Sequence, residues 1–479
     1  MSNQLNDKLA QYDVLYIEKV KYFLEQPINQ LYQELVKQKR EYYKPDQRIV
    51  FIDSVPSVDT GPFYNYLNRI LRHLDIDDCF IHIEKYGNDT VQNPTNFDIP
   101  ETICINPWIN LEIRQEGNLA PCCRFKIDDY PNVTTTSVKD LDYSDLRQQF
   151  LDGEKPMGCV NCWKNETHGV RSQRQNDAYV HRDRIFDIDY NDITRRNLIG
   201  LDIKINKTCN LSCRICGPDF SSKWVNEVSQ NKQSYPQYSS LTLLKNEWTD
   251  VSGSRVWKDL EAITNELSYL TFSGGEPLLD KTHSNLLQYF INKKRSSYIS
   301  LHYNTNATTF AANLIPIWSD FKEVELSLSI DNTGKKFEYE RYGVSWKTIV
   351  DTIEKYKRVT DAVINLNVWS TITTLNILDT YTLFQFCRDH ELPILFNPLN
   401  SPQQLNIGSF NKKQKKYITD KLLSIQDDEF QKIIEPIVSI MNNTTTSMDT
   451  ANMIDYLSIT DRIRKQDYKQ TYKELANIL

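Results

Sequence analysis

The sequence has no run of apolar residues long enough to span a bilayer, and its first residues show no signal-peptide pattern. It also has no excess of basic residues, because 56 Lys and Arg stand against 63 Asp and Glu, giving a net charge of −7. Bulk charge therefore does not favour nucleic acid or an anionic membrane as a partner. These absences predict a cytoplasmic protein with no membrane partner, and they argue against a nucleic-acid ligand.

Histidine is scarce, with 7 residues in 479, whereas there are 10 cysteines. In a reducing compartment these cysteines do not suggest a disulfide framework. Two groups of them, within 104–162 and 209–216, favour metal binding instead. Cys79 and Cys387 lie apart from both groups in apolar runs, so we expect them to be buried small hydrophobic residues.

Four regions follow one another along the chain. Residues 1–100 predict a small α/β accessory region, with a helix within 13–43 and a strand within 47–55. Residues 101–180 are rich in cysteine and contain a predicted hairpin with its turn at Gly117. Residues 195–402 form the predicted catalytic core, and 403–479 read as a helical tail with a basic, solvated face.

The core region alternates strand-like and helix-like segments. Six strand-like runs occur at 198–206, 267–275, 298–306, 324–331, 365–374 and 393–400. Such alternation predicts a parallel sheet with right-handed crossovers. Because a closed barrel needs eight units, six predict an α/β fold with a partial, open (β/α)6 TIM-like barrel. Its ligands should bind at the C-terminal ends of the strands.

A segment with three cysteines directly follows the first of these strands. Cys209, Cys213 and Cys216 have the spacing C-x3-C-x2-C. An iron-sulfur cubane normally takes four thiolates, so three leave one iron open to a small molecule. The alternative is zinc with a histidine as fourth ligand, but the nearest histidines, His181 and His283, are far from this segment.

A second motif, Gly274-Gly275-Glu276, ends the second strand-like run. Two glycines would let the backbone approach a ligand closely. The carboxylate of Glu276 is suited to an ammonium group. Because the ends of neighbouring parallel strands meet at one edge of a sheet, this motif should lie beside the three cysteines.

The two motifs together resemble those of the radical S-adenosylmethionine (SAM) enzymes, and the resemblance covers the core region. It implies that the three cysteines ligate a [4Fe-4S] cluster whose free iron binds SAM. It also implies reductive cleavage of SAM to a 5′-deoxyadenosyl radical, which abstracts hydrogen from a substrate, and a reducing donor such as flavodoxin or ferredoxin. The resemblance carries SAM-binding roles to Ile215, Gly274, Gly275, Glu276, Asn304, Asn306, Ser329 and Arg341.

The other cysteine group resembles the auxiliary-cluster modules of that superfamily called SPASM and Twitch, although those modules usually follow the barrel. The expected ligands of a second iron-sulfur cluster are Cys104, Cys122, Cys159 and Cys162. Zinc remains an alternative, because C-x2-C pairs also serve zinc ribbons. Cys123 could replace its neighbour as a ligand. The charged residues Arg171, Arg174 and His181 follow, and we expect a solvated linker there.

The expected substrate is a peptide or protein side chain, because superfamily members with such modules often act on peptides. One alternative is a small molecule, such as a sugar or nucleotide derivative. Another is a non-catalytic iron-sulfur or zinc scaffold, against which the intact Cys209, Cys213, Cys216 and Glu276 argue. No general acid or base can be named from the sequence, because the radical would perform the abstraction.

Overall fold

The computed structural model describes residues 14–17, 48–51, 101–167, 171–181, 188, 190, 192–194, 196–204, 206–238, 259, 267–280, 283–444 and 446–479. The chain divides into two compact units, Met1–Ile99 with Asp183–Asp187 and Pro100–Arg182 with Ile188–Leu479. Cys79 lies outside the described residues. Among the residues described, no helix combines the length and the apolar character needed to cross a membrane.

The first unit contains two described strands, β1 (Val14–Ile17) and β2 (Arg48–Phe51), which pair in parallel. β2 confirms the strand predicted within 47–55. At Val14–Ile17, β1 corrects the start of the helix predicted within 13–43, since these four residues are β-branched, aromatic or aliphatic and pair with β2. The rest of that predicted helix lies outside the described residues.

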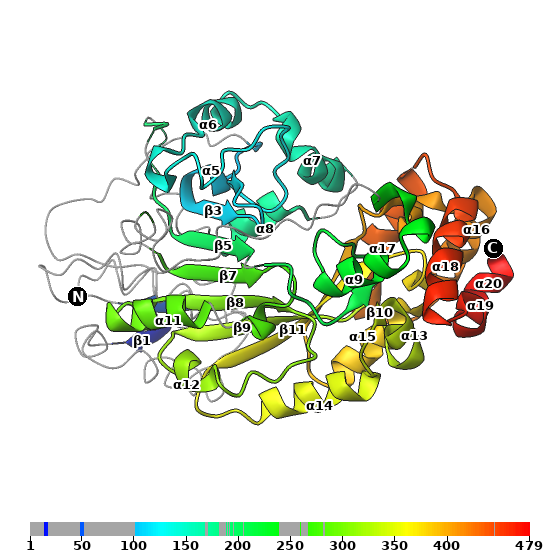
Figure 1. The fold of residues 1–479 in the computed structure, drawn as a ribbon. Helices are drawn as coiled ribbons and strands as arrows, with labels where there is room; N and C mark the ends of the chain where they lie inside the picture. The colour runs from blue at the N-terminus through cyan, green and yellow to red at the C-terminus, as the bar shows by residue number, and fades with distance from the viewer. Residues whose placement is uncertain are drawn as a thin grey trace, which may run out of the picture. The chain divides into compact units, whose positions relative to one another are not determined.

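The second unit is built on an eight-stranded sheet in the order β12-β11-β9-β8-β7-β5-β3-β4 (Figure 1). Six strands of the core region are parallel neighbours in their chain order: β5 (Gly200–Lys204), β7 (Tyr269–Ser273), β8 (Ser300–Thr305), β9 (Glu323–Ser329), β11 (Ile364–Ile372) and β12 (Ile394–Pro398). Four lie within runs predicted as strands, and β9 and β11 begin one residue before theirs. The predicted parallel α/β sheet is therefore confirmed, and its strand order is consistent with a TIM-like arrangement.

The cysteine-rich region adds two strands to this same sheet. β3 (Asn110–Ile113) pairs in parallel with β5, and β4 (Leu119–Ala120) pairs antiparallel with β3. The predicted hairpin is confirmed, and Gly117 has the positive φ of +81° that its turn requires. The pairing of β3 with β5 makes the hairpin an extension of the core sheet, which the sequence pattern did not predict.

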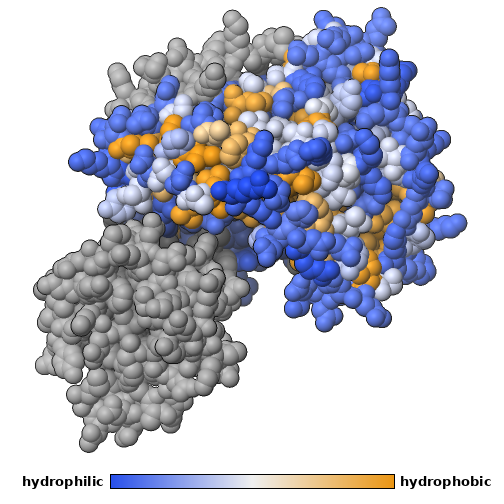
Figure 2. Space-filling model, turned by 90° about the horizontal axis from the view of Figure 1, so that it is seen from below, coloured by the Kyte–Doolittle hydropathy of each residue, from blue (hydrophilic) through white to orange (hydrophobic). Residues whose placement is uncertain are grey.

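Helices cover the apolar face of the sheet, where α11 (His283–Asn292), α12 (Ile315–Trp318) and α14 (Trp346–Lys357) lie along it (Figure 1). Tyr303 of β8 packs between Phe272 and Trp318 with ring centroids 5.1 and 5.3 Å apart. Seen from below, the outer surface is largely hydrophilic, with apolar residues in separate groups (Figure 2). The other α-helices that are described in the sheet region are α5 (Asn106–Ile109), α6 (Ser144–Leu151), α7 (Val160–Thr167), α8 (Gln173–Val180), α9 (Ser222–Gln230), α13 (Gly334–Glu340) and α15 (Thr380–Asp389).

The C-terminal region is helical, as predicted, and contains α16 (Lys412–Leu423), α17 (Asp428–Asn443), α18 (Thr450–Arg464), α19 (Tyr468–Thr471) and α20 (Lys473–Ile478). Its last stretch is broken rather than continuous, because Lys465 adopts a left-handed conformation with φ 53° at the end of α18. Arg464, on the predicted solvated face, is buried and pairs with Glu227 at 3.0 Å, so that part of the prediction is wrong.

Candidate functional site

The segment with three cysteines lies beyond the C-terminal end of β5 and is fixed to the turn after β7. Gly275 N donates to the Asn206 carbonyl at 2.8 Å, and Glu276 N donates to the Thr208 carbonyl at 2.7 Å. A Cβ added to Gly275 would lie 2.2 Å from the Thr208 carbonyl oxygen. The glycine was predicted to let a ligand approach; in the structure it lets these two segments of the chain approach each other.

The carboxylate of Glu276 is buried and accepts hydrogen bonds from its own chain. The donors are Thr305 Oγ1 at 2.7 Å, Asn306 N at 2.6 Å and Leu278 N at 3.1 Å. Burial raises the pKa of Glu276 to about 7, although these hydrogen bonds act in the opposite direction. A carboxylate has about four acceptor positions, so one is left for a further donor. The predicted contact of Glu276 with the SAM ammonium group stays a prediction.

Two polar side chains approach the sulfur atoms. Asn306 Nδ2 lies 3.8 Å from Cys209 Sγ, and Arg341 Nη1 lies 3.8 Å from Cys213 Sγ. The second contact follows from a short antiparallel pairing of β6 (Ser212–Cys213) with β10 (Arg341–Tyr342). Arg341 also pairs with the buried carboxylate of Asp331 at 2.8 Å. The carboxylate partner that the structure gives to Arg341 thus belongs to the protein itself.

The three thiols lie close enough to influence one another. The pKa of Cys216 is raised to about 12, first by burial and then by the neighbouring Cys213 and Cys209. Burial likewise raises the pKa of Cys213 to about 11, against the lowering effect of Arg341. A bound metal would favour the thiolates. In the described part of the chain, no three His, Cys, Asp or Glu side chains stand ready to hold a metal ion, so ligation requires these thiols to turn toward one point.

The C-terminal helices hold the cysteine segment from outside. Arg214, next to Cys213, is fully buried and pairs with Asp461 of α18 at 2.6 Å. Its guanidinium also lies 3.7 Å from the centroid of the Tyr339 ring. Tyr456 donates to the Arg214 carbonyl at 2.6 Å. The tail therefore fixes the backbone between the second and third cysteines.

The second cysteine group is also brought together. Cys104, Cys159 and Cys162 are buried, Cys122 is half-buried and Cys123 is exposed. The pKa of Cys104 is raised first by burial and then by Cys159 and, more weakly, Cys162. The pKa of Cys122 is raised first by burial and also by Cys123, Cys104 and Cys159. Each of the four predicted ligands thus lies within electrostatic reach of at least two of the others, while their ligation of a metal and the identity of that metal stay predictions.

Arg174 is not the solvated linker residue that we expected. It is buried, pairs with Glu166 at 2.6 Å and donates to the carbonyls of Glu101 and Ile103 at 2.7 Å each. These bonds tie the segment before Cys104 to the helices that follow Cys159, and so Arg174 helps to position the second group. The expected burial of Cys387 is confirmed.

A polar face of the sheet was missed by the sequence reasoning. His302 of β8 lies 2.8 Å from Ser327 Oγ of β9, and Ser327 donates to Asn367 of β11 at 2.7 Å. On β5, burial raises the pKa of Asp202 to about 7. The signal was present, because strands such as Glu323–Ser329 alternate polar and apolar residues, whereas strands buried on both faces are continuously apolar.

The three remaining residues with predicted SAM contacts, Asn304, Ser329 and Ile215, lie on different segments of the chain. Asn304 lies on β8 in the same alternation as His302, and it is half-buried. Ser329 ends β9 and pairs in register with Trp369 of β11. Ile215 is half-buried in the cysteine segment. Nothing in the structure contradicts their predicted roles, which stay predictions.

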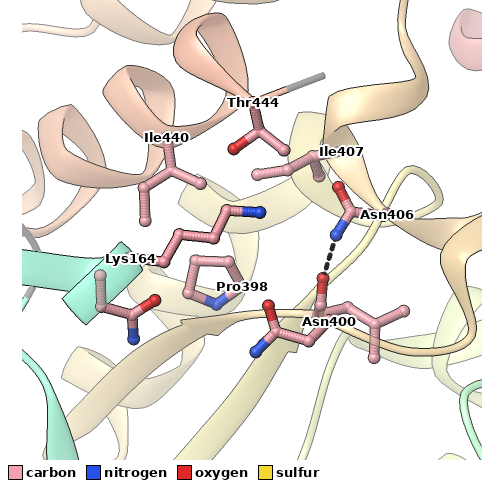
Figure 3. A pocket seen from close by; sticks show the side chains of 9 residues that line it. Lys164, Pro398, Asn400, Asn406, Ile407, Ile440 and Thr444 are labelled. Carbon is pink, nitrogen blue, oxygen red and sulfur yellow. Dashed lines mark hydrogen bonds between the residues drawn. The ribbon is translucent and has the colours of Figure 1, made fainter. Parts of the chain in front are cut away.

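A groove runs between α7 and the chain that follows β12. Three adjoining hollows, of about 10, 440 and 70 Å³, share Asn400 in their linings. Figure 3 shows the smallest, where the Lys164 side chain extends between Pro398 and Ile440. The rim is held by Asn406, whose amide donates to the Leu399 carbonyl. The 70 Å³ hollow is lined by Cys162 of the second cysteine group and by its neighbour Asn161.

No protein-family model matches this sequence, and no curated protein matches it either. Among solved structures, it is similar to native anSMEcpe with bound AdoMet, at 15% identity and a TM-score of 0.33, covering 52% of this chain and 63% of that one. It is also similar to Streptococcus suis SuiB bound to S-adenosylmethionine, at 14% identity and a TM-score of 0.30, covering 68% and 70%. SuiB bound to its precursor peptide SuiA gives 13% identity and a TM-score of 0.30, covering 74% and 87%.

Proposed function

We propose that this protein is a radical SAM enzyme. The observation that carries the proposal is the attachment of the three-cysteine segment to the Gly274-Gly275-Glu276 turn by two backbone hydrogen bonds, at the C-terminal ends of β5 and β7. Cys209, Cys213 and Cys216 would hold a [4Fe-4S] cluster and leave one position for SAM. When bound, such a cluster supplies the electron that cleaves SAM to a 5′-deoxyadenosyl radical.

The chain's own groups would prepare this site. Arg341 and Asn306 lie beside two of the sulfur atoms and would stabilise their charge by hydrogen bonding. The Glu276 carboxylate holds the end of β8 in place and keeps one acceptor position. Ile215, Asn304 and Ser329 would complete the contacts with SAM.

We infer that the substrate is a peptide or protein side chain. An open groove lined by many side-chain amides suits the repeated N–H and C=O groups of a peptide better than a single small molecule. The four thiols of the second group would hold a further iron-sulfur cluster, with zinc as the alternative. Full ligation by Cys104, Cys122, Cys159 and Cys162 favours electron transfer or a structural role for it.

The test is an anaerobic preparation assayed for iron, sulfide and reductive SAM cleavage. Cys213→Ala should lose the core cluster and SAM cleavage, because it removes one of three ligands. Cys387→Ala is the matched control, since this thiol is also buried but lies on α15, and it should keep both. A Cys213→Ala protein with the iron content and cleavage rate of the control would overturn the proposal.

A further inference from the structure

The groove beside α7 is unusual in its charge. Four cationic side chains contribute to its three hollows: Arg124, Lys126, Lys164 and Arg171. Among the described residues that line it there is no Asp or Glu. The whole chain has the opposite balance, with a net charge of −7. A cationic groove on an acidic protein attracts an anionic ligand and selects against cationic ones.

The rest of the lining is rich in amides. Eight such side chains contribute: Asn161, Asn165, Asn176, Asn397, Asn400, Asn406, Gln173 and Gln403. Each amide carries both donors and an acceptor, which match the alternating groups of a peptide backbone. Trp369 is the single aromatic residue in the described lining. Single-stranded nucleic acid is bound through successive aromatic platforms, so this composition favours a peptide.

The groove also leads toward the candidate site. Its 70 Å³ hollow is lined by Trp369 of β11 and Leu395 of β12, which pair in register. Trp369 pairs on its other side with Ser329 of β9, a predicted SAM contact. Cys162 of the second group lines the same hollow. A peptide lying in the groove would therefore have one end beside Cys162 of the second group and near the strand that carries Ser329.

We propose that this groove binds an acidic segment of a peptide, with carboxylates at its cationic side chains and backbone groups at its amides. If the protein is the radical SAM enzyme proposed above, this segment belongs to its substrate and brings the residue to be modified to the strand ends. The binding itself requires neither the core cluster nor SAM.

The test measures fluorescence anisotropy of labelled peptides with the full-length protein. A peptide rich in Glu, Gly and Ser should bind roughly tenfold or more tightly than the same peptide with Lys in place of Glu, and added salt should weaken its binding. Lys126→Glu combined with Lys164→Glu should weaken binding of the Glu peptide by about tenfold, since two attractions become repulsions. Both lysines are exposed, so the fold should tolerate the change.

The matched control is Lys335→Glu with Lys347→Glu, which changes the net charge equally at exposed positions on α13 and α14. It should bind the Glu peptide like the unaltered protein. Equal losses in the two double variants, or no preference for the Glu peptide, would overturn the proposal, as would tighter binding of a labelled oligonucleotide of similar length. A Cys213→Ala protein should bind the Glu peptide normally, so a failure of the enzyme assignment would not be confused with a failure of the groove.

Discussion

Gly275→Ala should separate the two segments that form the candidate site. An added Cβ would lie 2.2 Å from the Thr208 carbonyl oxygen and 2.8 Å from the Lys207 carbonyl carbon. Both atoms belong to the backbone, so a side-chain rotation cannot relieve the clash. The φ of Gly275 is one that alanine can adopt, and the whole cost therefore comes from this contact.

The expected cost has two parts. Overpacking of a tight contact costs about 1–3 kcal/mol. Separation of the segments would also weaken the bonds from Gly275 N to Asn206 and from Glu276 N to Thr208, each worth about 0.5–1.5 kcal/mol. The free energy of unfolding should therefore fall by about 2–6 kcal/mol.

Urea unfolding would measure this loss, and the iron content after anaerobic reconstitution would report on the cysteine segment. Gly217→Ala is the control, because its added Cβ would meet only Tyr238 Oη at an ordinary 3.5 Å. It should keep both stability and iron. A Gly275→Ala protein that matches this control in both measurements would refute the role assigned to the close approach.

Three further changes test other parts of the structure. Arg341→Gln leaves Asp331 buried without its cation, so urea unfolding should show a loss of about 3–5 kcal/mol that the double variant with Asp331→Asn partly restores; equal stability of single and double variants would contradict this. Ala at both Cys159 and Cys162 should lower the iron content by about half if both centres are cubanes; loss of zinc alone would identify a zinc site, and no loss of metal would exclude a metal there. Burial lowers the pKa of His283 from 6.5 to about 4. The stability that the neutral imidazole contributes is therefore complete above pH 6.5 and is lost as the pH falls toward 4, and the total loss is roughly 3 kcal/mol at most. His283→Phe should remove this loss, and an equally steep decline of its unfolding free energy over the same pH range would count against it.

Local sequence pattern predicted the elements of the core well. The run that contains Tyr269–Ser273 has the strand propensity and the glycine ending that define β7, and α17 lies within the tail predicted to be helical. The hairpin turn at Gly117 also followed from its sequence. These features depend on neighbours in the chain, so periodicity and turn residues suffice to predict them. The spacing of the cysteines likewise named candidate thiols, and their role as metal ligands stays a prediction.

The tertiary structure decided which distant groups satisfy one another. Arg214 pairs with Asp461, which is 247 positions away in the sequence. Arg341 pairs with Asp331, a carboxylate of the protein itself rather than of a ligand. The Glu276 carboxylate accepts hydrogen bonds from Thr305 Oγ1 and from two backbone N–H groups, so most of its acceptor positions are already occupied. A sequence pattern shows that a charged side chain lies on a given element. Only tertiary packing decides whether that side chain is buried and which partner then offsets the free-energy cost of removing its charge from water.

The pairing of β3 with β5 has the same origin. The alternation of residues in Asn110–Ile113 predicts a strand with one apolar face, but it does not say which strand edge will receive its backbone hydrogen bonds. The edge of β5 is available because the core sheet is open, and β3 covers it. The sequence by itself thus determined the strands and the candidate ligands. Their arrangement was decided by the tertiary structure, because the pairing of open strand edges and of buried charges depends on contacts between distant parts of the chain.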